Sequence, residues 1–143
     1  MSLKTMTGLE IIQAMFDGSL AYPPITETMP LKGIVVEKGR VVFEARADGR
    51  HLNQVGGVNG GFAAAILDSV TGYTVVSMLE RGETCVTIDL HIKMLHAITK
   101  DVPLEAEGRL ISLSRSLGSS EATIKDHENR LCAHATATCM ILR

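Results

Sequence analysis

Residues 51–80, HLNQVGGVNGGFAAAILDSVTGYTVVSMLE, form the stretch that decides how this chain folds. Their second part predicts one helix from near Asn59 to near Leu79, because the side-chain oxygen of Asn59 can cap the first turn. Apolar residues fall on every face of this helix, which is typical of a helix enclosed in a core. We therefore expect the rest of the chain to be built around it.

Asp68 is the only charged residue between Arg50 and Glu80. An ionised carboxylate in an apolar setting is costly unless it has a partner or a chemical use. Two interpretations follow: a structural carboxylate bonded to a hydroxyl or to backbone, or a functional one. The pair Gly60-Gly61 also allows two, because glycines permit either close packing of the helix or close approach of a ligand to its backbone.

Composition limits the possible classes. A chain of 143 residues is expected to form one domain, 1–143, with a sizeable core. The net charge of -2 and the lack of Trp argue against nucleic-acid binding. No apolar run reaches the roughly 20 residues that span a membrane, and no signal peptide is recognisable. Three cysteines without a CxxC indicate reduced thiols in the cytoplasm.

The remaining chain predicts one short helix and six strands. The helix is expected at about residues 7–17, and a proline-rich loop follows it. Strands are expected at 31–36, 40–47, 86–94, 103–114, 119–126 and 131–142. Two strands, a long helix and four consecutive strands predict an α+β fold with an antiparallel sheet, because a parallel sheet needs a helix between successive strands.

Two local details of this pattern concern the end of the long helix and the strand that follows it. Residues 81–83 are expected to stop the long helix, with Gly82 as its C-terminal cap. In 86–94, apolar and polar residues alternate, which predicts a half-buried strand with Thr87 on its polar face.

The pattern HxNxxGxxNGGxxxxxxD resembles that of the PaaI-like (phenylacetate-degradation) hotdog-fold thioesterases, in which HxNxxGxxHGG precedes an acidic residue on the same helix. The matching positions are His51, Asn53, Gly56, Gly60, Gly61, Asp68, residues 87–89 and residues 133–138. The resemblance covers about residues 31–142 and implies a hotdog fold, an antiparallel β-sheet wrapped around one long central helix. Asn59 stands where the family has His, and the family's Pro is missing from residues 95–97.

The resemblance implies an acyl-CoA thioesterase that hydrolyses a small aryl- or medium-chain acyl-CoA, with no metal or redox cofactor. The N–H of Gly60, at the positive end of the helix dipole, would bind the thioester oxygen. Asp68 would act as a general base on water or as the nucleophile. Asn53 would orient the thioester or the water, and Thr87 would support Asp68.

The spacing of Gly60 and Asp68 adds a constraint. Eight residues separate them, so on one helix they lie roughly 12 Å apart along the axis. That is too far to act on one carbonyl. Either one of them is not catalytic, or each site combines Gly60 of one subunit with Asp68 of another. The family's dimer does the latter, which predicts a homodimer with shared active sites or a tetramer of such dimers.

Other residues are candidates for holding the substrate. Asn59 is either only a helix cap or also a contact to the thioester, beside Gly61, and His51 is expected to shape its loop. The acyl group is expected near Phe62, Leu67 and Met94. CoA phosphates need cations, and the candidates are Arg109, Arg115 and Lys125, of which we select Arg115.

Other classes are less well supported. The five histidines show no metal-ligand spacing, and no GxSxG nucleophile motif is present. A non-catalytic acyl-CoA-binding module is the main alternative, favoured if Asn59 marks a lost activity. A hotdog hydratase usually pairs an Asp with a His a few residues later, and no His follows Asp68 on its helix.

Overall fold

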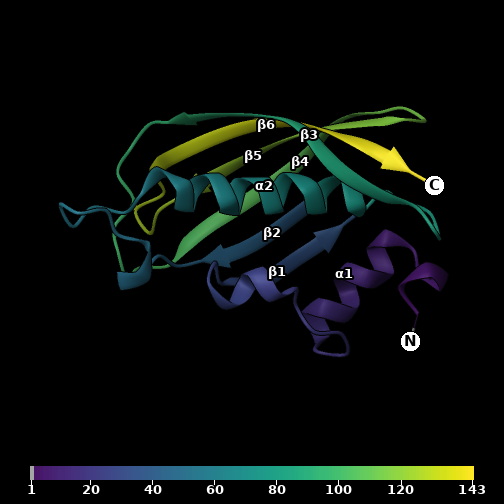
Figure 1. Cartoon of the computed structure of the whole chain (residues 1–143), viewed down its shortest axis with the longest axis horizontal. Helices are drawn as coiled ribbons and strands as arrows, with labels where there is room; N and C mark the ends of the chain where they lie inside the picture. Colours follow the sequence, from purple (N-terminus) through teal and green to yellow (C-terminus); the bar gives the residue numbers. More distant parts are fainter. Residues whose placement is uncertain (1) are drawn as a thin grey trace.

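The computed structural model describes residues 2–143 (Figure 1). Six strands form one antiparallel sheet in the order β1-β2-β4-β5-β6-β3. Their bounds are β1 Leu31–Glu37, β2 Arg40–Ala45, β3 Thr84–Met94, β4 Leu104–Leu113, β5 Leu117–Lys125 and β6 Leu131–Leu142. The long helix α2, Gly60–Val76, lies across one face of this sheet. The predicted antiparallel sheet around one long helix is confirmed.

The N-terminal region packs against one end of α2. Helix α1, Gly8–Asp17, begins with a capping box in which Thr7 and Glu10 bond to each other's backbone N–H. The N–H of Gly8 donates to the carbonyl of Leu79 at 2.9 Å, which joins α1 to the chain just beyond α2. Short 3-10 turns complete the chain at η1 Leu3–Thr5, η2 Pro24–Glu27 and η3 Gly49–His51.

Two glycines let α2 lie directly on the sheet. A Cβ at Gly108 of β4 would lie 2.0 Å from Thr74 Oγ1, and one at Gly118 of β5 would lie 2.6 Å from Val75 Cγ1. The Thr74 hydroxyl donates to the carbonyl of Val70 at 2.8 Å, so this buried polar group is satisfied. The position of α2 is therefore fixed by close packing without unpaired polar atoms at these contacts.

The other side of α2 is not enclosed, which corrects the prediction of a helix buried on every face. From Gly61 to Gly72 the half-exposed or exposed residues there are small, apart from Asp68, and we call this set the open face: Gly61, Ala64, Ala65, Asp68, Ser69 and Gly72. The larger half-exposed residues Tyr73 and Val76 follow at the C-terminal end of the helix. The physical reason is that residues 2–143 form one sheet, which covers only one side of the helix.

Helix α2 ends earlier than predicted, and Gly82 is not its cap. The cap is Ser77, whose hydroxyl donates to the carbonyl of Thr74 at 2.6 Å. The same hydroxyl accepts from the N–H of Gly39 at 2.9 Å, in the turn between β1 and β2. This contact with a distant turn ends the helix, and Gly82, with φ +82, lies in the turn before β3.

A β-bulge at Ile88 overturns the predicted alternation in β3. Thr87 lies opposite Cys139 of β6 and Asp89 opposite Thr138, so Ile88 is the extra residue. Since Cys139 is fully buried on the inner face, Thr87 shares that face and Asp89 points to the other. The prediction that Thr87 lies on the polar face is wrong, and Val86, on the outer face, is 44% exposed.

Candidate active site

Asp68 lies in the middle of the open face, beside a cavity of about 300 Å³. Its Oδ1 is buried and has no hydrogen-bond partner among residues 2–143. Leaving a buried acceptor unpaired costs about 1–3 kcal/mol, and more when the group is charged. This oxygen is therefore available to a water or ligand that enters the cavity.

Three segments of the chain form the walls of the Asp68 cavity. They are the loop before β1, the open side of α2 and the beginning of β3. The lining residues are Pro23, Ile25, Asp68, Ser69, Gly72, Tyr73, Val76, Cys85 and Thr87. The bulge at Ile88 brings Thr87 to this cavity, so the structure places Thr87 and Asp68 together.

A pair of thiols lies behind Thr87. Cys85 lines the cavity, Cys139 is buried behind it, and all three cysteines of the chain are free. A hydrogen bond from the Cys85 thiol, helped by the Thr87 hydroxyl 3.8 Å away, lowers the pKa of Cys139 to about 7. The same bond, together with burial, raises the pKa of Cys85 well above its usual range.

The N-terminus of α2 presents one free backbone donor. The Asn59 side-chain oxygen accepts from the N–H of Gly61 at 2.7 Å, and the Asn59 carbonyl accepts from Phe62 at 3.0 Å. Asn59 is thus the helix cap that the sequence predicts. The N–H of Gly60 has no partner within the described chain, and with the helix dipole it can stabilise negative charge on an oxygen.

Gly60 opens onto a second cavity, of about 290 Å³. Its walls come from the start of α2, the end of β3 and the loop that follows. The lining residues are Val58, Asn59, Gly60, Ala63, Met94, Leu95, His96, Ala97, Ile98 and Cys132. This cavity shares no lining residue with the Asp68 cavity. Along the axis of α2, Gly60 and Asp68 are separated by roughly 12 Å.

His51 and Asn53 organise the loop that leads into α2. His51 Nδ1 accepts from the N–H of Asp48 at 3.0 Å, and Nε2 donates to the carbonyl of Thr28. Both ring nitrogens are therefore engaged. The Asn53 side-chain oxygen accepts from the N–H groups of the residues at 55 and 57, at 3.0 and 3.1 Å. Its amide nitrogen remains available as a donor.

The expected acyl-binding residues lie apart. Leu67 is fully buried in the core, and Phe62 is 1% exposed with its ring centroid 4.7 Å from that of His51. Met94 is half-exposed and lines the Gly60 cavity. Leu67 therefore belongs to the core, because it lies on the side of α2 that the sheet covers, and it lines neither cavity.

The candidate cations lie away from both cavities. Arg115 lies in the turn between β4 and β5, where its carbonyl accepts from Arg143 at 2.7 Å. Arg109 forms an ion pair with Glu107 at 3.2 Å, and with Lys125 it lines a smaller cavity, of about 180 Å³, on the outer face of the sheet. None of these three cations lines the Asp68 or the Gly60 cavity.

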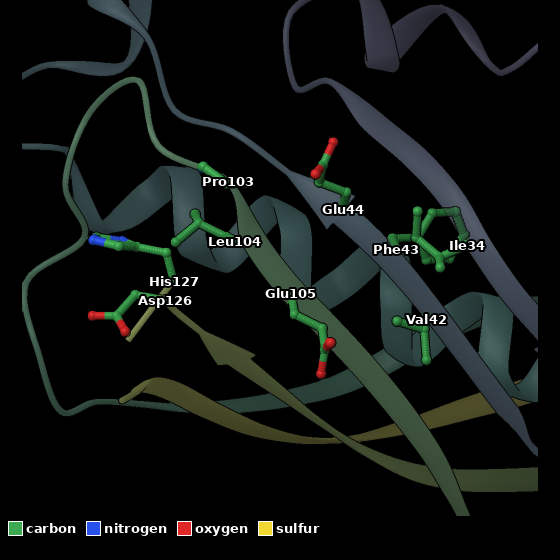
Figure 2. Close-up of a pocket in the computed structure, with 9 residues that line it drawn as sticks. All are labelled: Ile34, Val42, Phe43, Glu44, Pro103, Leu104, Glu105, Asp126 and His127. Atoms are coloured by element: carbon green, nitrogen blue, oxygen red, sulfur yellow. The ribbon is translucent and has the colours of Figure 1, made fainter. Parts of the chain in front are cut away.

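A third cavity, of about 270 Å³, lies on the side of β2 and β4 turned away from α2 (Figure 2). Glu44 and Glu105 stand opposite each other there, and Asp126 and His127 approach from the turn between β5 and β6. Three carboxylates would repel the phosphates of CoA. This cavity therefore does not suit the CoA part of a substrate.

Within residues 2–143, no group of three His, Cys, Asp or Glu side chains could hold a metal ion. No helix in that range is long and apolar enough to cross a membrane.

Sequence reasoning missed seven residues that line the Asp68 cavity: Pro23, Ile25, Ser69, Gly72, Tyr73, Val76 and Cys85. Cys85 could have been found, because it is two residues from Thr87 and so shares its face. Tyr73 was missed because its largely apolar ring is typical of a core residue in a buried helix. Pro23 and Ile25 gave no signal, because a loop before the first strand carries no periodic pattern.

Comparison with known proteins identifies the family. A family model described as the thioesterase superfamily matches residues 55–133, more than half of the chain. The chain belongs to the thioesterase superfamily. It is therefore a thioester hydrolase, as the sequence predicts. The matched range includes Gly60, Asp68 and Thr87, whereas no curated protein matches the chain.

Solved structures agree with the family and confirm the hotdog fold. This thioesterase is 30% identical to a phenylacetic acid degradation-related protein of Ralstonia eutropha JMP134, with a TM-score of 0.83 over 91% of this chain and 98% of that one. It is 25% identical to a Streptococcus pneumoniae TIGR4 thioesterase protein solved with coenzyme A, with a TM-score of 0.73 over 78% and 85%. A Streptococcus mutans UA159 protein bound to acetyl-CoA shares the fold at 23% identity, a TM-score of 0.73 and coverages of 78% and 88%.

Proposed function

We propose that this thioesterase hydrolyses acyl-CoA that carries a small aryl or medium-chain acyl group, releasing the free acid and CoA. The observation that carries the proposal is the unpartnered Oδ1 of Asp68 in a cavity that also contains Thr87. Two relatives support the substrate: one is described as phenylacetic acid degradation-related, and another was solved with coenzyme A. A cytoplasmic location suits CoA and the free thiols.

We further propose that two copies share each active site, with Gly60 from one and Asp68 from the other. One chain keeps these residues in separate cavities roughly 12 Å apart along the axis. Small residues on the open face would let a second helix approach closely. The adjacent edge strand β3 exposes Val86 and Ile88, which a second copy would cover. A dimer, or a tetramer of such dimers, satisfies these features.

The reaction then has two routes. In both, the N–H of Gly60 binds the thioester oxygen as it gains negative charge. Either Asp68 accepts a proton from a water whose oxygen attacks the carbonyl carbon, or its carboxylate attacks directly and forms a mixed anhydride that water hydrolyses. In each case the C–S bond breaks and CoA leaves as a thiolate that takes up a proton. Thr87 supports Asp68, and the free amide nitrogen of Asn53 orients the thioester or the water.

The test is CoA release, followed with a thiol reagent over a panel of aryl- and alkyl-CoA thioesters. Asp68→Asn should lower kcat by about 10²–10⁴-fold, because the amide is neither a base nor a nucleophile. Asp89→Asn is the matched control, since Asp89 points away from α2 and pairs with His91 at 2.8 Å. If the wild type binds these thioesters without cleaving them, the chain is instead an acyl-CoA-binding module. Single turnover in H₂¹⁸O separates the routes, because only the anhydride route can leave ¹⁸O in Asp68.

The backbone N–H of Gly60, the proposed oxyanion donor, can be removed with little other change to the helix. Gly60→Pro removes one N–H at the first position of a helix, where proline is tolerated, and Asn59 already has the extended backbone that precedes proline. Activity should fall by about 10²–10³-fold. Gly60→Ala keeps the N–H and adds a Cβ whose nearest neighbour is the flexible end of Met94, at 3.3 Å. This variant should retain most of the activity.

The same variants test whether the sites are shared. A mixed dimer of one Asp68→Asn chain and one Gly60→Pro chain has one intact site and one doubly damaged site. Purified with two different tags, it should recover about half of the wild-type activity, although each parent is nearly inactive. A mixed dimer as inactive as its parents would contradict shared sites and leave the thioesterase assignment standing.

A further inference from the structure

Residues 22–29, which we call the strap, run along the exposed side of α2. Pro23 and Ile25 line the Asp68 cavity together with Tyr73 and Val76, near the C-terminal end of the helix. At the other end of the strap, Met29 lines a cavity with Asn59, Gly61 and Phe62 at the start of the helix. The strap therefore passes α2 in the opposite direction and forms one wall of the Asp68 cavity.

Hydrogen bonds hold the strap at both ends. The N–H of Gly33 donates to the Tyr22 hydroxyl at 2.9 Å. Arg50 donates to the backbone carbonyl of Glu27 at 2.7 Å, and His51 donates to that of the next residue. The strap is thus a fixed wall, and the histidine of the sequence motif helps to position it.

The chemistry of the Asp68 cavity suits an acyl group better than CoA. Beyond Asp68 and Thr87, most of its wall is apolar, and no Lys or Arg lines it. The phosphates of CoA need cations, so that end of the substrate must extend elsewhere. A volume of about 300 Å³ lies at the lower limit of ligand cavities, which favours a small acyl group. Ile25, 51% exposed in this chain, stands on the wall that such a group would meet.

We propose that Ile25 determines which acyl groups this thioesterase accepts, by packing against the acyl chain beyond the carbonyl carbon. The inference rests on the proposed function and assigns the acyl group to the cavity between the strap, α2 and β3. It replaces the expected location beside Leu67 and Phe62, which are buried in the core. A smaller side chain at position 25 would lengthen the cavity, and a larger one would shorten it.

The experiment measures kcat/KM over straight-chain acyl-CoA from acetyl to lauroyl, and over phenylacetyl-CoA. Ile25→Ala should shift the preference toward longer chains by about tenfold or more, and Ile25→Phe should shift it toward shorter ones, since each methylene in an apolar pocket is worth about that much. Ile34→Ala is the matched control, because Ile34 is 54% exposed and lies at the cavity on the far side of the sheet. It should keep the wild-type profile.

A binding measurement separates this inference from the proposed function. The Kd of each acyl-CoA is measured by calorimetry in the Asp68→Asn background, with and without the Ile25 substitutions. A Kd or kcat/KM profile that shifts with Ile25 supports the inference, even if the wild type proves to bind without turnover. Profiles that stay unchanged in both Ile25 variants overturn it, and hydrolysis that depends on Asp68 would still support the proposed function.

Discussion

The two faces of α2 differ in whether their buried polar groups have hydrogen-bond partners. On the face against the sheet, Val70 and Val75 are fully buried and the Thr74 hydroxyl has its acceptor. On the open face the side chains are small, and Asp68 keeps a buried oxygen without a partner among the described residues. The face whose polar groups are paired holds the helix against the sheet. The open face, with its unpaired carboxylate oxygen, can bind water, substrate or a second chain. Substitutions on the two faces should therefore affect stability and activity separately.

The largest difference between the effect on activity and the effect on stability is expected at Asp68. Asp68→Asn should lower activity by about 10²–10⁴-fold and leave the free energy of unfolding unchanged or higher, because it replaces an unpartnered carboxylate by a neutral amide. Kinetics and urea unfolding of the same preparation measure both. A fall in stability of several kcal/mol would instead assign Asp68 a structural role.

Gly108→Ala, on the face of the sheet that packs against α2, should lower stability. The new Cβ would lie 2.0 Å from Thr74 Oγ1 and 3.0 Å from the carbonyl oxygen of Val70, so the helix must move. Overpacking of this kind costs about 1–3 kcal/mol, measurable as a lower urea midpoint. Gly49→Ala is the matched control, because a Cβ there meets no atom within 4 Å. An unchanged midpoint for Gly108→Ala would mean that α2 does not lie so close to the sheet.

A third substitution tests what covers the open face. Ala64→Leu adds a large side chain on that face, midway between Gly60 and Asp68, and both Ala and Leu are good helix formers, so the isolated chain should lose less than about 0.5 kcal/mol. If a second copy packs there, the dimer should dissociate and activity should fall with it. Light scattering and the CoA-release assay measure the two effects. An active, undissociated variant would exclude this face as the interface.

The smallest effect concerns the thiol pair behind Thr87. Because the pKa of Cys139 is lowered to about 7, its thiolate adds stability at alkaline pH, and this contribution is lost as the pH falls through 7. The raised pKa of Cys85 lowers stability at pH values above the usual thiol pKa, so the net change in stability is small. Thiolate absorbance should show a step near pH 7 that disappears in Cys139→Ser. A step that persists would come from another thiol.

The comparison also explains what the sequence could predict. The cap at Asn59, the period of α2 and the spacing from Gly60 to Asp68 are local, so they could be read directly. The bulge at Ile88 could not, because one extra residue reverses the face of every later side chain without changing the pattern of residue types. The strap contact at Ile25 depends on tertiary packing.

The direction in which Thr87 points therefore had to come from the structure. Arg115 was chosen as a cation at or near a strand end, and it lines neither the Asp68 nor the Gly60 cavity. The prediction of where α2 ends was wrong because the end depends on a tertiary contact. The Ser77 hydroxyl bonds to a turn that lies some 40 residues earlier in the sequence.

The interval between Gly60 and Asp68 has a consequence for symmetry. If two antiparallel helices place Gly60 of each beside Asp68 of the other, the two-fold axis must pass midway between these positions, at Ala64. The two catalytic centres would then lie only roughly 12 Å apart along the helices, on either side of that axis. Two bound acyl groups would be near neighbours, and because only about two turns of α2 separate the centres, binding at one should change the affinity at the other.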